Sequence, residues 1–149
     1  MRRALRVRQV LNAVNGSTLC GLAIARLGGA RLGKGPGGLV LATGYGLPIP
    51  KNPAFTVGNV VISRRALTSD RMLQHEAKHA TQWAACLGLP MLPMYGVASA
   101  WSWLRTRDYS SRNVFERLAG LDDGGYRERA PRPLRAPRLA SRHSPGRAT

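Results

Sequence analysis

Residues 68–87, with the sequence TSDRMLQHEAKHATQWAACL, are the stretch that decides the expected fold. Thr68 or Ser69 can serve as the N-cap of a helix, because the short oxygen side chain accepts a hydrogen bond from the first helical turn. Asp70 then lies in that first turn, where the helix dipole favours an anion. Gly88 predicts that the helix ends near residue 87. We therefore expect one long, well-capped helix here.

This helix carries the string His75-Glu76-Ala77-Lys78-His79. Histidines four residues apart point the same way on a helix, so both imidazoles can bind one metal ion. Glu76 lies on the same turn and can reach a water on that metal without being a ligand, which suits a general base. Imidazole ligands with an open position for water favour Zn²⁺. A surface helix that places these three side chains together by chance is the alternative.

A catalytic zinc ion needs a third protein ligand, and the best-placed carboxylate is Glu116. It lies in the predicted helical segment 113–120, which one intervening helix can bring back beside His79. The spacing of Asn113 and Glu116 also fits a capping box, in which Glu116 would close the start of its own helix. Asp108 and Asp122 are the fallback ligands.

Other polar residues near these positions are candidates for supporting roles. Zinc-bound imidazoles usually donate their second N–H to a carboxylate or carbonyl group. Such partners could come from Gln82, Asn113, Asp122 or Asp123. A group that stabilises the oxyanion of a hydrolysis would come from Tyr109, Tyr126, Arg112 or Arg117.

The rest of the chain predicts a small α+β domain. Residues 39–43 and 55–63 have the apolar, β-branched composition of strands, and Gly58-Asn59 interrupts the second one as a bulge or tight turn. We expect further helices over residues 1–14, about 93–105, and from 110–113 to about 120. The expected architecture is a short antiparallel sheet packed on the helix of residues 68–87, followed by two further helices.

The 149-residue chain, with 44% hydrophobic residues, is expected to form one compact core. The distribution of its charged residues nevertheless divides it into three parts. The formal net charge of +16 comes mostly from the ends: a basic N-terminal segment, residues 1–34, and an Arg- and Pro-rich tail, residues 127–149. We expect the tail to be disordered. The middle, residues 35–126, is nearly balanced and holds the predicted metal-binding domain.

Composition also limits which cellular compartment and which binding partners we expect. Two cysteines make no disulfide framework, so we expect a reducing compartment, the cytoplasm. The uncharged stretch 80–104 is long enough to span a bilayer, but its prolines divide it, and no membrane span is expected. The aromatic residues do not lie among the arginines, and no nucleic-acid motif occurs, which argues against specific nucleic-acid binding.

The two histidines and Glu76, with Glu116 downstream, resemble the zincin superfamily and its gluzincin branch. That resemblance implies a zincin-like fold with His75, His79 and Glu116 as metal ligands. In thermolysin-like members an Asp follows the ligand Glu four residues later, whereas this chain has Gly120.

A closer resemblance covers residues 54–83. The strand around Thr56-Val57-Gly58, and the string His-Glu-x-x-His-x-x-Gln that ends at Gln82, are similar to a bacterial domain of unknown function. That domain is associated with extracellular contractile injection systems and is assigned to the metallopeptidases. The segments Asn113–Glu116 and Gly124–Tyr126 resemble those of small uncharacterised actinobacterial proteins.

Together the motif and the resemblance predict a zinc-dependent metallopeptidase that hydrolyses a peptide or protein substrate. The strand of residues 55–63 would then pair with the peptide as an extra strand. A zincin-like protein that binds zinc without turnover is the first alternative. A basic protein that binds nucleic acid or an anionic surface is the second, supported by the charged ends.

Overall fold

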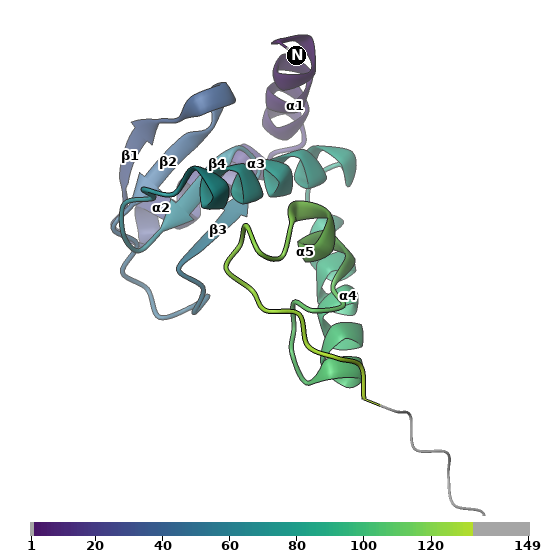
Figure 1. The fold of residues 1–149 in the computed structure, drawn as a ribbon. Helices are drawn as coiled ribbons and strands as arrows, with labels where there is room; N and C mark the ends of the chain where they lie inside the picture. Colours follow the sequence, from purple (N-terminus) through teal and green to yellow (C-terminus); the bar gives the residue numbers. More distant parts are fainter. Residues whose placement is uncertain (1, 133–149) are drawn as a thin grey trace, which may run out of the picture.

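The computed structural model describes residues 2–132, and part of the predicted tail, residues 133–149, lies outside the described residues. The chain forms an α+β fold with a small four-stranded sheet and, within the described residues, five α-helices (Figure 1). In chain order the elements are α1 (Arg2–Val14), α2 (Ser17–Leu27), β1 (Arg31–Lys34), a 3₁₀ turn (Pro36–Gly38), β2 (Val40–Thr43), β3 (Ala54–Val57), β4 (Val60–Ser63), α3 (Asp70–Ala85), α4 (Met91–Thr106) and α5 (Val114–Ala119).

The sheet is mixed, which corrects the prediction of a short antiparallel sheet. Its strand order is β1-β2-β4-β3, in which β1 and β3 pair antiparallel with their neighbours but β2 and β4 run parallel. The parallel pair arises because β3 and β4 form a hairpin whose second strand, β4, inserts beside β2. The expected strand of residues 55–63 is therefore two strands, β3 and β4, separated by a tight turn at Gly58-Asn59.

The turn at Gly58 requires glycine for two reasons. Its φ of 61° lies in the left-handed region, and a Cβ there would lie 2.5 Å from the backbone nitrogen of Thr18. The start of α2 thus packs directly on the hairpin turn. Residues 2–34 belong to the basic N-terminal segment, and they contribute α1, α2 and β1 to the same fold.

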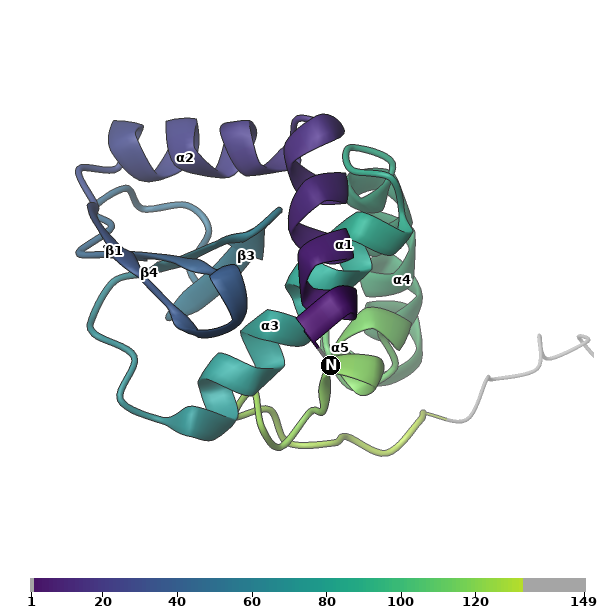
Figure 2. The same cartoon turned by 90° about the horizontal axis from the view of Figure 1, so that it is seen from above.

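Helices cover both faces of the sheet, and Figure 2 shows α2 and α3 on opposite sides of it. Along β4, Val60 and Ile62 pack with Ala25 of α2, whereas Val61 packs with Ala80 of α3. This alternation is the period-two geometry of a strand that is buried on both faces. A third cluster joins β3, α3, α4 and α5 through Val57, Trp83, Met91 and Phe115.

The helices α3, α4 and α5 lie close to the predicted ranges. Ser69 is the N-cap of α3, as predicted, and α3 ends at Ala85 before a positive φ of 92° at Gly88. α4 begins two residues before Pro93, because proline is tolerated in a first turn whose N–H groups have no helical partner. The helix α2 and the strand β1 had no sequence prediction.

Within residues 2–132, no single helix is long and apolar enough to cross a membrane. The pair α1 and α2 reaches the length and apolar content together, but the two helices are bent by 72° at the break between them.

Candidate metal centre

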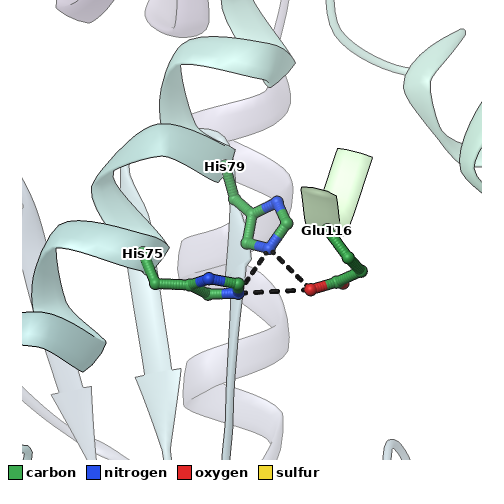
Figure 3. Close-up of side chains that lie close together, drawn as sticks. All are labelled: His75, His79 and Glu116. Atoms are coloured by element: carbon green, nitrogen blue, oxygen red, sulfur yellow. Dashed lines mark hydrogen bonds and ion pairs between the residues drawn. The ribbon is translucent and has the colours of Figure 1, made fainter. Parts of the chain in front are cut away.

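The helix α3 presents both predicted histidines on its buried side. His75 and His79 are almost fully buried, and their Nε2 atoms lie 3.0 Å apart. The exposed side of α3 carries Arg71, Gln74 and Lys78, so the helix has a polar outer face. The two imidazoles therefore converge from consecutive turns of one helix (Figure 3).

The short helix α5 brings Glu116 to the same point. Its Oε2 atom lies 3.2 Å from Nε2 of His75 and 3.6 Å from Nε2 of His79. Asn113, not Glu116, caps the start of α5, because the Asn113 side chain accepts a hydrogen bond from the backbone N–H of Phe115. The backbone N–H of Asn113 donates to the Ser110 carbonyl instead of to Glu116, so Glu116 does not close a capping box.

The fallback carboxylates lie elsewhere. Asp108 accepts hydrogen bonds from the backbone N–H groups of Ser110 and Ser111 and from the Ser111 hydroxyl, so it stabilises its own loop. These bonds outweigh the effect of burial and lower the pKa of Asp108. Asp122 is exposed. Among the described residues, His75, His79 and Glu116 form the group that could hold a metal ion.

The second nitrogens of both imidazoles have fixed partners. Nδ1 of His75 lies 2.9 Å from the backbone carbonyl of Gly120, and Nδ1 of His79 lies 2.8 Å from Oε1 of Gln82. The Gln82 amide nitrogen donates to the Phe115 carbonyl, so its oxygen faces His79. Since both partners are acceptors, both Nδ1 atoms carry the hydrogen and both Nε2 atoms present lone pairs.

Three electron-pair donors therefore meet at one buried point, and this group could hold a cation. Oε2 of Glu116 is buried without a hydrogen-bond partner among the described residues. Ligand atoms about 2.0–2.1 Å from a tetrahedral zinc ion lie roughly 3.3 Å from one another. The three observed separations, 3.0, 3.2 and 3.6 Å, lie around that value. The donor set and its spacing fit Zn²⁺.

Without a metal ion, protons are the cations that these donors would share. Burial alone would raise the pKa of Glu116, but the imidazoles of His75 and His79, whose Nε2 atoms lie 3.2 and 3.6 Å from Oε2, hold the pKa of this carboxyl at about 2. Burial alone would lower the pKa of His79, but the hydrogen bond and charge of Glu116 raise the pKa above its ordinary value. Both directions show that a positive charge at this point is stabilised.

Glu76 lies beside the metal site but is held by the sheet. Its Oε2 atom accepts a hydrogen bond of 2.6 Å from the Thr56 hydroxyl on β3. Burial raises the pKa of the Glu76 carboxyl above its ordinary value, against the opposing effect of Thr56 and the two imidazoles. Such a carboxylate accepts a proton more readily than an exposed one.

A cavity of about 670 Å³ opens beside these groups. Glu76, His79 and Glu116 line one part of it, and β3, α4 and the loops around Asn52 and Tyr109 form the rest. Most of the remaining wall is apolar, with side chains from Phe55, Val57, Trp83, Met91, Leu92 and Tyr95. The site is therefore reached from a cleft that can take a ligand with apolar groups.

The candidates for oxyanion stabilisation separate into two groups. Tyr109 and Tyr126 line the cavity, and the Tyr126 ring lies 5.9 Å from the His75 ring, measured between centroids. Burial and the charge of Glu116 raise the pKa of Tyr126, so its hydroxyl keeps its proton. Arg112 and Arg117 instead lie near Glu128. Its Oε1 atom is 3.6 Å from Nη2 of Arg112 and 2.7 Å from Nη1 of Arg117.

Several supporting residues lay outside the sequence predictions. Thr56 holds Glu76, and the Tyr95 hydroxyl donates to Oε1 of Glu116. The Nδ1–H group of His75 donates a hydrogen bond to the Gly120 carbonyl rather than to a carboxylate. Gly124 packs so closely on the His75 ring that a Cβ would lie 2.6 Å from it. The signal available in the sequence was the small size of Ala119 and Gly120, which permits a close approach of α5 to α3.

We compared the chain with models of protein families, with curated proteins and with solved structures, and no match was found. Function is therefore argued from the site itself.

Proposed function

We propose that the protein is a zinc-dependent metallopeptidase with a zincin-like site, in which His75, His79 and Glu116 bind the metal ion. The observation that carries the proposal is the convergence of three buried electron-pair donors on one point, with both Nδ1 atoms already engaged. A bound zinc ion supplies a Lewis acid that polarises a carbonyl group and lowers the pKa of a bound water.

Glu76 is the general base in this proposal. It accepts a proton from the water that attacks the peptide carbonyl carbon, and it passes this proton to the amine nitrogen as the C–N bond breaks. The hydrogen bond from Thr56 fixes the carboxylate beside the cavity, and the raised pKa suits a group that takes up and releases a proton.

The strand β3 is the proposed binding edge for the peptide. It is the last strand of the sheet, and its residues line the cavity. Phe55 and Val57 pair with β4 through the backbone, so the backbone groups of Ala54 and the N–H of Thr56 face the outer edge, where the Thr56 carbonyl already accepts a hydrogen bond from Nε1 of Trp83. A peptide laid there as an additional strand would pass beside Glu76 and His79.

The test combines zinc content with peptide cleavage in four variants. We expect purified wild-type protein to hold stoichiometric zinc, measured by mass spectrometry, and His79→Ala and Glu116→Ala to lose it. Glu76→Gln should keep the zinc but lower the cleavage of a fluorogenic peptide library by about 10²–10⁴-fold. Glu128→Gln, which changes an exposed carboxylate, is the matched control and should leave both unchanged.

Three results would contradict the proposal in different ways. Cleavage by Glu76→Gln at the wild-type rate would exclude Glu76 as the base. Stoichiometric zinc without cleavage of any library member would indicate the non-catalytic zinc-binding alternative. Zinc retained by Glu116→Ala would assign the third ligand to another residue.

A further inference from the structure

The helix α1 buries polar residues and exposes apolar ones, which is the reverse of an ordinary surface helix. Its polar residues Arg8 and Asn12 are buried, at 6% and 0% exposure. The Arg8 guanidinium donates to the Gly37 carbonyl, and the Asn12 amide donates to the Ala80 carbonyl of α3 and to the side-chain oxygen of Asn59. Hydrogen bonds, rather than apolar packing, thus hold α1 on the domain.

Four apolar residues of α1 lie on its outer side instead. Val7, Val10, Leu11 and Val14 are spaced as one helical stripe and are 57%, 59%, 38% and 81% exposed. Leu19 at the start of α2 is also exposed. A contiguous apolar stripe on the surface indicates a binding face rather than a random distribution of single residues.

Charge identifies the kind of partner. Arg2, Arg3 and Arg6 are exposed in the first turns of α1, and the sequence contains no acidic residue before Asp70. Figure 1 shows that this basic end of α1 projects away from the body of the molecule. An exposed helix that combines an aliphatic stripe with arginines matches an anionic lipid surface, which offers acyl chains beneath negative headgroups.

We propose that the outer face of α1, formed by Val7, Val10, Leu11 and Val14 with Arg2, Arg3 and Arg6, binds peripherally to an anionic phospholipid bilayer. A second copy of the chain is a poorer occupant, because the exposed arginines of two copies would repel each other. Peripheral binding leaves the hydrogen bonds of Arg8 and Asn12 in place, so the fold need not open. The proposal uses no residue of the metal centre and is independent of the proposed function.

The experiment measures sedimentation of the full chain with lipid vesicles. We expect binding to phosphatidylcholine vesicles that contain about one-third phosphatidylglycerol, weak binding to phosphatidylcholine alone, and a loss of binding as salt screens the arginines. Val10→Glu should lower the partition coefficient by at least about tenfold, because it places a carboxylate in the apolar stripe. Arg3→Glu should weaken binding to the anionic vesicles.

The matched control is Val97→Glu, which makes the same change at an exposed valine of α4, 72% exposed. It should bind vesicles like the wild type, and both variants should keep the circular dichroism spectrum of the folded protein. Equal losses in Val10→Glu and Val97→Glu, or unchanged binding in Val10→Glu, would overturn the proposal. So would a doubled molar mass in light scattering that Val10→Glu abolishes, without any vesicle binding, because this result would assign the face to a second copy.

Discussion

Gln82 is the residue that links the two halves of the candidate metal centre. Its amide oxygen accepts the hydrogen of His79 Nδ1, and its amide nitrogen donates to the Phe115 carbonyl on α5. One side chain thereby orients a histidine of α3 and fixes the helix that carries Glu116. Residues of this kind hold a ligand in the tautomer and direction that the metal requires.

We predict that Gln82→Leu weakens zinc binding by about 10–100-fold, because His79 loses its acceptor and the Phe115 carbonyl loses its donor. Competition with a chromophoric chelator measures the affinity. Gln74→Leu, an exposed glutamine on the same helix, is the control and should keep the wild-type affinity. An unchanged affinity in Gln82→Leu would mean that the fold alone orients His79.

Single residues also mark the limit of sequence prediction. His75, Glu76 and His79 could be found because their spacing on one helix already implies a shared direction. Thr56 and Tyr95 could not be assigned a role, since they reach Glu76 and Glu116 from other elements. Their positions depend on how the strand β3 and the helix α4 pack against α3 and α5.

At the scale of elements, α5 is short, and its start depends on Asn113. The Asn113 side chain caps the N–H of Phe115 and also donates to the Ser99 hydroxyl on α4, at 2.9 Å. The residue is fully buried. The Asn113 side chain therefore ties the first turn of the helix that presents Glu116 to α4.

We predict that Asn113→Ala lowers the free energy of unfolding by about 1–2 kcal/mol, because the N-cap is lost. Denaturant unfolding, monitored by circular dichroism, measures this change. Zinc affinity should fall together with stability, since α5 carries Glu116. Asn113→Ser keeps a capping oxygen and should restore most of the loss, whereas equal stability of the two variants would argue against a capping role.

Some helices have strong local sequence signals and were predicted closely, whereas others have none. The cap at Ser69 and the glycine at 88 predicted the limits of α3 to within two residues. The helix α2 gave no clear pattern, because it packs on the hairpin through Gly21, where a Cβ would lie 2.4 Å from the Val57 carbonyl oxygen. Close packing of a glycine is a tertiary requirement that helix propensity does not contain.

For the whole molecule, we expect a rise in pH to lower the stability of the zinc-free protein but to strengthen zinc binding. The pKa of His79 is raised in the folded protein, so without metal the stabilisation from its protonated form is complete below the ordinary pKa of about 6.5. This stabilisation is lost as the pH rises through the folded value. Zinc needs the neutral imidazole, so its binding strengthens over the same pH range.

We therefore predict that the increase in melting temperature caused by zinc, relative to protein treated with a chelator, grows from about pH 6 to about pH 8. Thermal unfolding at several pH values measures it. His79→Ala, which is expected to lose zinc, should show no increase in melting temperature with zinc at any of these pH values. A zinc effect that is constant over this range would show that His79 does not compete with protons for the metal.

The sequence by itself determined the helix α3, the convergence of its two histidines and the carboxylate of Glu76 on the same turn, because a helix fixes the direction of residues four positions apart. Tertiary structure decided the mixed order of the sheet, the arrival of Glu116 at the histidines and the inverted orientation of α1. These features depend on contacts between residues distant in the chain, such as Asn12 with Ala80 and Gln82 with Phe115, and local spacing does not specify such contacts.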